Sequence, residues 1–342
     1  MIYEFLMQQK HSHTIEIELH LFEGCNLSCG FCCQEHDDFD FNNNRLQEKL
    51  KILGDFIDSK MAYSIENNSN WTVNIMGGEL FADQNPDAFF DLYQECVDFC
   101  QKTIPRNKLD ISLTTNLVFT KRKRVMKFLS DNQINLTVSY DFAGRNWSKS
   151  QFSQYKENLK FFKDDITRIN MTLHRPAIKR MIAQKDIIFD YFYHYPYPID
   201  FTWYVPDLKN SKHYMPNDDD CLMALQFLRD NYPKVDLISN LINNDINPIQ
   251  CCSENRILID AFNNTSNCMY LDYGQKNFST PIDRDSTKSL FHSYIEKKGC
   301  LTCQHFNKCG LYCFVAEDFK HKQENALCFL KEFLNETVKE SI

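Results

Sequence analysis

Three cysteines near the amino terminus are spaced so that their thiolates can share one metal cluster. Cys25, Cys29 and Cys32 form a C-x3-C-x2-C motif directly after a run of alternating polar and apolar residues. Three thiolates on one loop can hold three irons of a 4Fe–4S cluster and leave the fourth iron open. An open iron can bind a chelating ligand, as an open catalytic metal position does. A zinc knuckle with His36 as its fourth ligand is the alternative.

A second group of cysteines follows residue 250. Cys300 opens a C-x2-C-x5-C-x3-C motif, three cysteines after residue 250 precede this motif, and one follows it. The complete group is Cys251, Cys252, Cys268, Cys300, Cys303, Cys309, Cys313 and Cys328. We find no secretory signal, so we expect a reducing cytoplasm in which these thiols bind metal rather than form disulfides. A double zinc site is the alternative to iron here.

Glycine is scarce, and most glycines lie beside motifs. The chain has 9 Gly and 15 Cys among 342 residues, so we expect each glycine to meet a backbone need that a Cβ would obstruct. Gly77 and Gly78 stand together after a strand-like run and directly before Glu79. Ligand sites of α/β folds gather at this end of the strands. We therefore expect these three residues to contact a ligand.

Strand-like and helix-like segments alternate as far as residue 206. The expected strands cover 14–22, 72–76, 109–115, 134–140, 168–174 and 199–205, and the expected helices cover 44–58, 86–102, 121–131, 150–163 and 178–192. Repeated βα units build a parallel sheet. Six such units predict an α/β fold with a partial (β/α)6 TIM-like barrel, which stops short of the eight units of a complete one.

The pattern changes after residue 206, which indicates further parts of the chain. We divide the sequence into an N-terminal extension (1–13), the partial barrel (14–206), a linker with a bridging helix (207–249) and a cysteine-rich domain (250–342). Within the last part, the runs 256–262 and 268–273 predict a hairpin. The chain from Cys328 onward predicts an amphipathic helix.

Composition and charge exclude several classes of protein. A hydrophobic content of 43% and a charged content of 25% are those of a globular protein. No stretch approaches about 18 apolar residues, so we expect no membrane-spanning helix. The net charge of −8 does not favour nucleic acid as a partner. We therefore expect a cytoplasmic protein with neither a membrane nor a nucleic acid as partner.

The C-x3-C-x2-C motif after a first strand resembles the signature of the radical S-adenosylmethionine enzymes. The resemblance implies that the open iron of the Cys25, Cys29 and Cys32 cluster chelates the amino and carboxylate groups of S-adenosylmethionine. It further implies that an electron, from a donor such as flavodoxin or ferredoxin, cleaves this cofactor. The products are methionine and a 5′-deoxyadenosyl radical, which abstracts a hydrogen atom from the substrate.

Other stretches match this family's cofactor-binding motifs. Gly77-Gly78-Glu79 is similar to the stretch that contacts the methionine amino group, and Phe31 matches an aromatic position near the adenine. Val138-Ser139-Tyr140-Asp141 resembles the family's V-S-x-D stretch, and Thr114-Thr115-Asn116 resembles a T-N-G ending. The cofactor-binding residues implied are Phe31, Gly77, Gly78, Glu79, Thr115, Asn116, Ser139 and Asp141.

Two positions depart from the family pattern. Leu117 stands where the T-N-G ending has glycine. Related enzymes also place an arginine about a dozen residues after the V-S-x-D stretch, where this chain has Gln151. Arg145 or Lys149 are the candidates to replace that arginine.

The later cysteines resemble the seven-cysteine SPASM domain, with Asn263 where the pattern has glycine. The resemblance implies two auxiliary 4Fe–4S clusters, and so three clusters in all. The outer cluster would be held by Cys300, Cys303, Cys309 and Cys328. The inner cluster would be held by Cys252, Cys268 and Cys313, with Cys251, Cys221 or an open site as the fourth position. Asparagine tolerates a left-handed turn position, so we expect the hairpin to be kept.

A three-cluster enzyme of this kind implies an oxidoreductase that acts on a peptide or protein. The leading hypothesis is a maturase that oxidatively installs a C–C, thioether or related crosslink in a ribosomally made peptide. With 13 residues before the first strand, we expect no precursor-recognition domain there, so a separate recognition protein is a possible partner. The alternatives are a formylglycine-forming enzyme of the anaerobic sulfatase-maturase type and a non-catalytic zinc-bound scaffold. No catalytic acid or base is assigned.

Overall fold

One eight-stranded sheet is the frame of the molecule. The computed structural model describes residues 14–32, 34, 36–184, 186–195, 197–204, 211–243, 255–266, 292–306, 309 and 328–340. The strand order is β6-β5-β4-β3-β2-β1-β7-β8. The bounds are β1 Thr14–His20, β2 Asn70–Met76, β3 Leu109–Thr115, β4 Asn135–Tyr140, β5 Ile166–Leu173, β6 Ile199–Trp203, β7 Arg256–Ile259 and β8 Thr265–Ser266. All neighbouring pairs from β6 to β7 are parallel, and β7 pairs antiparallel with β8.

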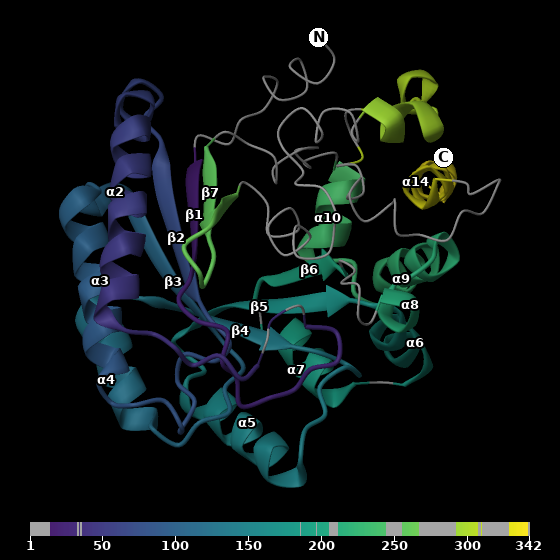
Figure 1. The fold of residues 1–342 in the computed structure, drawn as a ribbon. Coiled ribbons are helices and arrows are strands. Elements are labelled where there is room, and N and C mark those ends of the chain that lie inside the picture. The colour runs from purple at the N-terminus through teal and green to yellow at the C-terminus, as the bar shows by residue number, and fades with distance from the viewer. Residues whose placement is uncertain are drawn as a thin grey trace.

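Helices connect the six barrel strands. Their bounds are α2 Asn43–Glu66, α3 Phe89–Thr103, α4 Arg122–Asn132, α5 Lys149–Phe161, α6 Arg175–Ala183 and α7 Ile187–His194, with a 3-10 turn, η1, at Arg106–Lys108. Helices α2, α3 and α4 lie side by side along one outer face of the curved sheet (Figure 1). The alternation of βα units thus forms the predicted partial barrel.

The two faces of the sheet differ in chemistry. On β2, Trp71 and Val73 are fully buried, and the Trp71 indole donates a hydrogen bond to Ser64 of α2 at 2.8 Å. Successive side chains of a strand point to opposite faces, so Asn74 lies on the inner face. Its side-chain oxygen accepts hydrogen bonds from Ser112 at 3.3 Å and from Thr114 at 3.1 Å on β3. The barrel therefore has an apolar face toward the helices and polar side chains within.

The helix predicted over 178–192 is wrong in one respect, because two helices cover this stretch. Helix α6 ends at Ala183, and Asp186 has an extended backbone. The Asp186 carboxylate accepts the backbone N–H groups of Ile188 and Phe189, both at 2.9 Å. A side chain that caps free N–H groups starts a new helix, so α7 begins at Ile187.

The later elements pack against the β6 side of the barrel (Figure 1). They are α8 Ser211–Tyr214, α9 Asp218–Asn231, α10 Asp236–Asn243, η3 Cys300–Thr302 and α14 Phe329–Glu340. The Trp203 ring of β6 meets the Phe329 ring of α14 edge-on, with centroids 5.4 Å apart. The boundaries predicted at 206 and 249 fall among residues outside the described ranges and stay predictions, as does the extension at 1–13.

A hairpin does follow the predicted first strand, but its second strand, β8 Thr265–Ser266, lies before the run expected to form it. Asp260 ends β7, because its carboxylate accepts the backbone N–H groups of Phe262 and Asn264, both at 2.8 Å. Asn263 has a left-handed φ of 67°, so asparagine does take the turn conformation that the glycine of the pattern would have. The hairpin is also part of the barrel sheet, since β7 pairs with β1. The run 268–273 lies outside the described residues.

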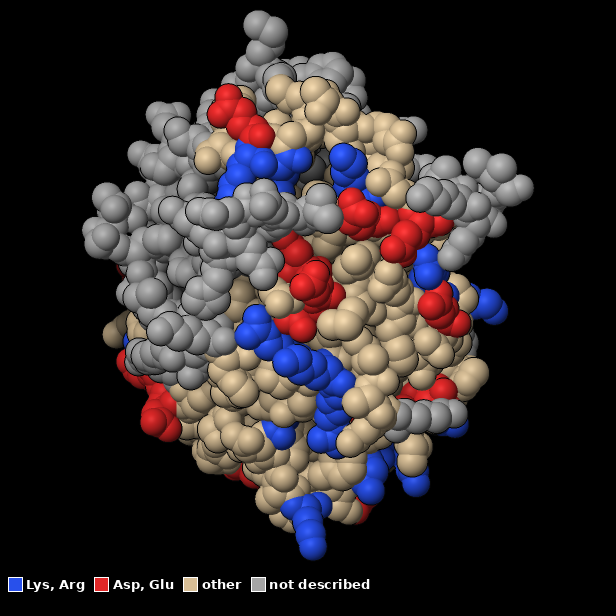
Figure 2. All heavy atoms as spheres, turned by 90° about the vertical axis from the view of Figure 1, so that its right-hand side faces the viewer, with Lys and Arg blue, Asp and Glu red and all other residues tan. Residues whose placement is uncertain are grey.

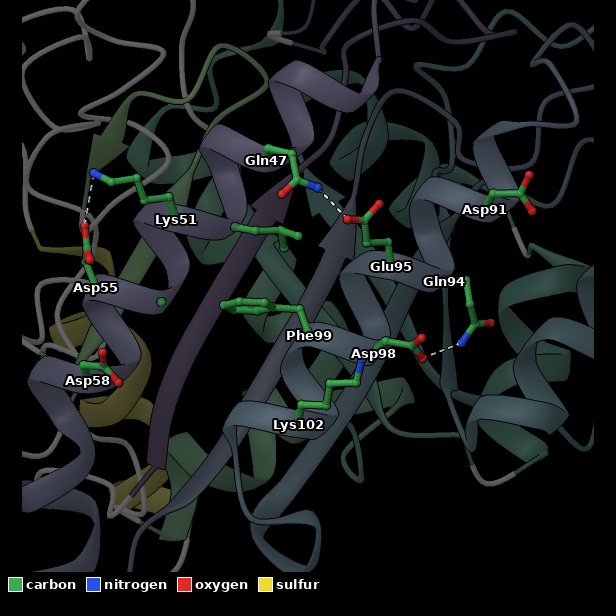
Figure 3. A pocket seen from close by; sticks show the side chains of 12 residues that line it. Gln47, Lys51, Asp55, Asp58, Asp91, Gln94, Glu95, Asp98, Phe99 and Lys102 are labelled. Carbon is green, nitrogen blue, oxygen red and sulfur yellow. Dashed lines mark hydrogen bonds and ion pairs between the residues drawn. The ribbon is translucent and has the colours of Figure 1, made fainter.

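Charged side chains form small groups on the surface. On the face that Figure 2 shows, acidic and basic residues neighbour one another, and the described residues present no broad surface of one sign. A groove on the outer side of α2 and α3 is likewise mixed: Asp55, Glu95 and Asp98 line it together with Lys51 and Lys102 (Figure 3). None of the predicted site residues lines this groove. No helix among the described residues is both long and apolar enough to cross a membrane.

Candidate metal and cofactor site

The predicted site residues of the barrel meet at one rim. The cysteine loop follows β1, Gly77–Glu79 follows β2, Thr115 and Asn116 end β3, and Ser139 and Asp141 end β4. Because these strands are parallel neighbours, their carboxyl ends lie at the same edge of the sheet. This is the edge at which α/β folds bind ligands.

Gly78 brings the turn after β2 against the loop after β1. Its N–H donates to the Phe22 carbonyl at 2.9 Å, and the Glu79 N–H donates to the Gly24 carbonyl at 2.9 Å. A Cβ on Gly78 would collide with the Gly24 carbonyl oxygen. Gly78 therefore meets a backbone need that a Cβ would obstruct, as we expected for the few glycines of this chain.

Glu79 holds three neighbouring groups with its carboxylate. It accepts hydrogen bonds from Thr115 Oγ1 at 2.7 Å, from the Asn116 N–H at 2.6 Å and from the Phe81 N–H at 3.1 Å. The side chain is fully buried, and burial raises the pKa of Glu79 to about 7 despite these donors. The carboxylate therefore ties β2 to β3, and its predicted contact with a cofactor amino group stays a prediction.

Asn116 extends this network to the cysteine loop. Its side-chain amide donates to Asn26 Oδ1 at 2.9 Å and lies 3.6 Å from Cys25 Sγ. The following residue, Leu117, has a left-handed φ of 58° and is fully buried. The chain thus keeps, with leucine, a backbone conformation that glycine adopts without strain.

The three thiols of the loop are partly buried and close enough to influence one another. Burial raises the pKa of Cys25 to about 12, and the nearby Glu79 adds to this rise. Burial also raises the pKa of Cys29 to about 11, whereas the Arg145 guanidinium opposes the rise. Cys32 contributes to both values by its proximity. Such desolvated thiols become thiolates only beside a compensating cation, and the irons of a cluster supply that charge.

Two more residues of the loop, His36 and Cys33, are near the three cysteines in the sequence. His36 contacts the loop with its backbone carbonyl, which accepts the Cys25 N–H at 2.9 Å. Cys33 lies outside the described residues. Among the residues that the structure describes, no three His, Cys, Asp or Glu side chains converge closely enough to hold a single metal ion. The ligands of a four-iron cluster each bind a different iron, and the assignment of Cys25, Cys29 and Cys32 to such a cluster stays a prediction.

Phe31 and Asp141 are held by a residue that the sequence analysis missed. The His174 ring stacks on Phe31 with centroids 4.8 Å apart and 28° between the planes. His174 Nδ1 accepts the Ala177 N–H at 3.1 Å, so Nε2 carries the proton and donates to Asp141 at 2.7 Å. His174 lies directly after β5, at the same rim. That position was the available signal for it.

Asp141 is fully occupied by donors from the protein. Besides His174, its carboxylate accepts the N–H groups of Ala143, at 2.9 Å, and of Gly144. Burial alone would raise the pKa of Asp141, but the hydrogen bonds from His174 and from the Gly144 N–H outweigh it and lower the pKa. Asp141 thus shapes the loop after β4 and positions His174 against Phe31.

The candidates for the place of the family's arginine have different surroundings, and their role stays a prediction. Arg145 Nη2 donates to the predicted cofactor residue Ser139 at 2.6 Å. Lys149 is exposed at the start of α5. Gln151 caps α5 by accepting the Ser148 N–H at 2.9 Å, and it donates to the Asn26 carbonyl at 3.1 Å. Of the three, Arg145 is the cation at the rim.

Four later cysteines line one cavity of their own. The cavity is lined by Cys300, Cys303, Cys309 and Cys328, together with Tyr294, Lys298, His305, Phe306, Leu330 and Lys331. Burial raises the pKa of Cys300 to about 12, and the other three thiols add to this rise. The structure therefore brings together all four residues that the SPASM resemblance assigns to the outer cluster.

A buried cation accompanies these thiols. The side chain of Lys298 is 5% exposed, and its Nζ lies 3.4 Å from the Asp218 carboxylate at the start of α9. Its charge opposes the rise in the pKa of Cys300 and of Cys328. Helix α9 thereby contacts the cavity through an ion pair.

The inner set of cysteines is only partly described. Cys251, Cys252, Cys268 and Cys313 lie outside the described residues, so the inner cluster stays a prediction. Cys221, one candidate for its fourth ligand, is buried on α9.

Comparison with known proteins identifies the fold. No family model matches the sequence, and no curated protein matches it. Among solved structures, a histidine-tagged form of anSMEcpe with bound AdoMet (S-adenosylmethionine) superposes with a TM-score of 0.65 at 17% identity, covering 95% of this chain and 96% of that one. Native anSMEcpe with bound AdoMet and Cp18Cys peptide gives 0.61 at 17% identity, covering 96% and 95%.

A second enzyme of known structure gives the same result. SuiB of Streptococcus suis bound to its precursor peptide SuiA gives a TM-score of 0.58 at 16% identity, covering 96% of this chain and 77% of that one. At these identities the likeness shows the fold. The chain has the partial-barrel fold of the radical S-adenosylmethionine enzymes, as its sequence predicted.

Proposed function

We propose that this protein is a radical S-adenosylmethionine enzyme that modifies a peptide. The observation that carries the proposal is the Glu79–Asn116–Cys25 network. It joins the cysteine loop, the G-G-E turn and the end of β3 at the ligand-binding edge of the sheet. The same fold binds S-adenosylmethionine in the anSMEcpe structures.

The residues at the rim fit the cluster and the cofactor that this function needs. Cys25, Cys29 and Cys32 offer three partly buried thiols for three irons, and Arg145 supplies a positive charge beside Cys29. When bound, the cluster and S-adenosylmethionine supply the radical that abstracts hydrogen. The protein's part is to hold the cluster, to orient the cofactor with the turns after β2, β3 and β4, and to shield the site from water.

We assign the outer auxiliary cluster to the four cysteines around the Lys298 cavity, and the inner one to Cys252, Cys268 and Cys313. These clusters would accept the electron that an oxidised substrate releases. With the barrel cluster, the protein would carry three clusters and about twelve irons. A flavodoxin or ferredoxin would deliver the first electron, and a reducing cytoplasm would keep the thiols available.

For the substrate, we propose a ribosomally made peptide in which a C–C, thioether or related crosslink forms. Both anSMEcpe and SuiB are seen with peptides bound, which supports a peptide in the barrel of the same fold here. The chain spans 77% of the SuiB chain, and a separate protein could recognise the precursor.

Formylglycine formation on a protein Cys or Ser is the second candidate. The observation that favours it is that this chain and anSMEcpe cover one another almost completely, at 95% and 96%. Both candidates begin with the same radical step, and they differ only in the product that forms.

One assay separates these possibilities. The protein is reconstituted anaerobically and incubated with S-adenosylmethionine, a reductant and either a neighbouring gene's short peptide or a sulfatase peptide. A crosslink gives 5′-deoxyadenosine and a peptide lighter by two hydrogens, whereas formylglycine gives an aldehyde. A fully iron-loaded protein that forms no 5′-deoxyadenosine overturns the proposal. Two or three zinc ions per chain in place of iron indicate the scaffold alternative.

A further inference from the structure

Arg145 carries buried hydrogen-bond donors that have no acceptor among the described residues. Its Nη2 donates to Ser139 at 2.6 Å, but Nε and Nη1 are buried without a partner. The Trp147 ring packs against the guanidinium, whose central carbon lies 5.8 Å from the ring centroid. Folded proteins seldom leave buried charged donors unpaired, so this arrangement points to a ligand that brings the acceptor.

The carboxylates nearest to Arg145 are already paired with other donors. Its charge acts on both Asp141 and Glu79, lowering the pKa of each against the effect of burial. Yet Asp141 accepts from His174 and from two N–H groups, and Glu79 accepts from Thr115, Asn116 and Phe81. No ion pair between Arg145 and a carboxylate occurs within the described ranges. Among the described residues, no carboxylate therefore neutralises the Arg145 guanidinium.

The neighbouring candidates do not offer the same chemistry. Lys149 is exposed, and Gln151 uses its amide to cap α5 and to hold the Asn26 carbonyl. Arg145 is also close enough to Cys29 to oppose the rise in its pKa. Arg145 therefore lies beside the loop that would hold the cluster, and the open iron of this cluster would chelate the cofactor.

We infer that Arg145 binds the carboxylate of S-adenosylmethionine, with Ser139 fixing the guanidinium. The inference rests on the proposed function, and it gives this role to a residue of the loop after β4, whereas related enzymes have their arginine at the later position of Gln151. A guanidinium suits a carboxylate because it is planar, always charged and rich in donors. Ser139 is then a positioning residue that acts through Arg145.

The test compares two ligands that differ only in this carboxylate. Dissociation constants of S-adenosylmethionine and of its decarboxylated analogue are measured by equilibrium dialysis on the anaerobically reconstituted holoprotein. We expect Arg145→Met to weaken S-adenosylmethionine binding by about ten- to a hundredfold, the effect of losing a hydrogen bond to a charged group. Binding of the decarboxylated analogue should change by less than about threefold, because that ligand has no carboxylate to lose.

Two further variants complete the design. Lys149→Met removes an exposed positive charge close in the sequence and should leave both constants unchanged. Arg145→Lys keeps the charge but not the planar donor set, and should show a smaller loss than Arg145→Met. Iron content and the electron paramagnetic resonance spectrum of the reduced cluster without ligand verify that each variant keeps its cluster.

The outcomes separate the inference from the proposed function. Equal weakening of both ligands in Arg145→Met, or unchanged binding of S-adenosylmethionine, overturns the role of Arg145 while the function stands. A wild-type holoprotein that binds no S-adenosylmethionine overturns both.

Discussion

The Asn116 backbone N–H donates a 2.6 Å hydrogen bond to Glu79, and the side-chain amide of the same asparagine lies 3.6 Å from Cys25 Sγ. One residue at the end of β3 thus connects the turn after β2 with the cysteine loop after β1. All three of these residues are on short loops, which by themselves have many conformations. Their common network therefore fixes the loop that would hold the cluster.

Removal of the Asn116 side chain should loosen the cysteine loop. Asn116→Ala keeps the backbone bond to Glu79 but loses the bond to Asn26 and the contact with Cys25. We expect a loss of about 1–3 kcal/mol in the free energy of unfolding, since buried partners are left unpaired, and a lower iron content. Iron analysis and denaturant unfolding under anaerobic conditions measure both effects.

Asn135→Ala is the matched control, because its amide bonds Asp110 at an exposed position. It should keep its iron and lose little stability. If Asn116→Ala retains as much iron as the control, the network does not support the cluster.

Gly78 should tolerate an added methyl group much less well than Gly54. A Cβ on Gly78 would collide with the Gly24 carbonyl oxygen, whereas a Cβ on Gly54 would lie 3.3 Å from the Phe99 ring. Gly54 lies within α2 beside the groove of Figure 3. We expect Gly78→Ala to lower the melting temperature strongly and to reduce iron loading. Gly54→Ala should change stability by no more than about 1 kcal/mol, since alanine favours a helix interior. Equal melting temperatures for the two variants would contradict the close approach at Gly78.

Stability should fall as pH rises because of Glu79. Its pKa in the folded protein is about 7, against an ordinary value of 4.5, so the folded state holds this proton more tightly. The stabilisation is complete below about pH 4.5 and is lost as pH rises through about 7, a difference on the order of 3 kcal/mol.

Glu79→Gln removes this titration. The free energy of unfolding of the wild type relative to the variant should therefore be larger at about pH 5 than at about pH 8. Glu66→Gln, at an exposed position of α2, is the control and should show no such difference. A wild-type advantage that stays constant over this range would show that Glu79 is ionised throughout.

Lys298 should raise the reduction potential of the outer auxiliary cluster. A buried positive charge stabilises the more negative, reduced form of a cluster. Lys298→Met should therefore lower the midpoint potential in a redox titration followed by electron paramagnetic resonance. Lys331→Met removes an exposed lysine that lines the same cavity and should have a smaller effect, because solvent screens its charge. Equal shifts, or an upward shift, would contradict the assignment.

The sequence predicted the barrel and its rim, because local patterns determine both. The strand expected at 109–115 is β3, and motifs that follow successive parallel strands must meet at one edge. Asn263 was likewise predictable from its residue type, and its φ is left-handed.

Features that depend on distant or capping contacts were not predicted. The pairing of β7 with β1 joins Glu16 to Arg256 across most of the chain, and no local period reports such a pair. Asp186 divides a continuous helical pattern because its side chain caps α7. His174 reached the site through a stacking contact with Phe31, which neither motif spacing nor composition indicates.

We propose that the Cys25, Cys29 and Cys32 loop holds the cluster that binds and cleaves S-adenosylmethionine. The most direct measurement is 5′-deoxyadenosine formation by the anaerobically reconstituted protein, with iron counted in the same samples. We expect about twelve irons and 5′-deoxyadenosine from the wild type, and about eight irons and none from the variant with all three cysteines changed to alanine. An iron-loaded wild type that forms no 5′-deoxyadenosine, or a triple variant that forms as much as the wild type, would contradict the claim.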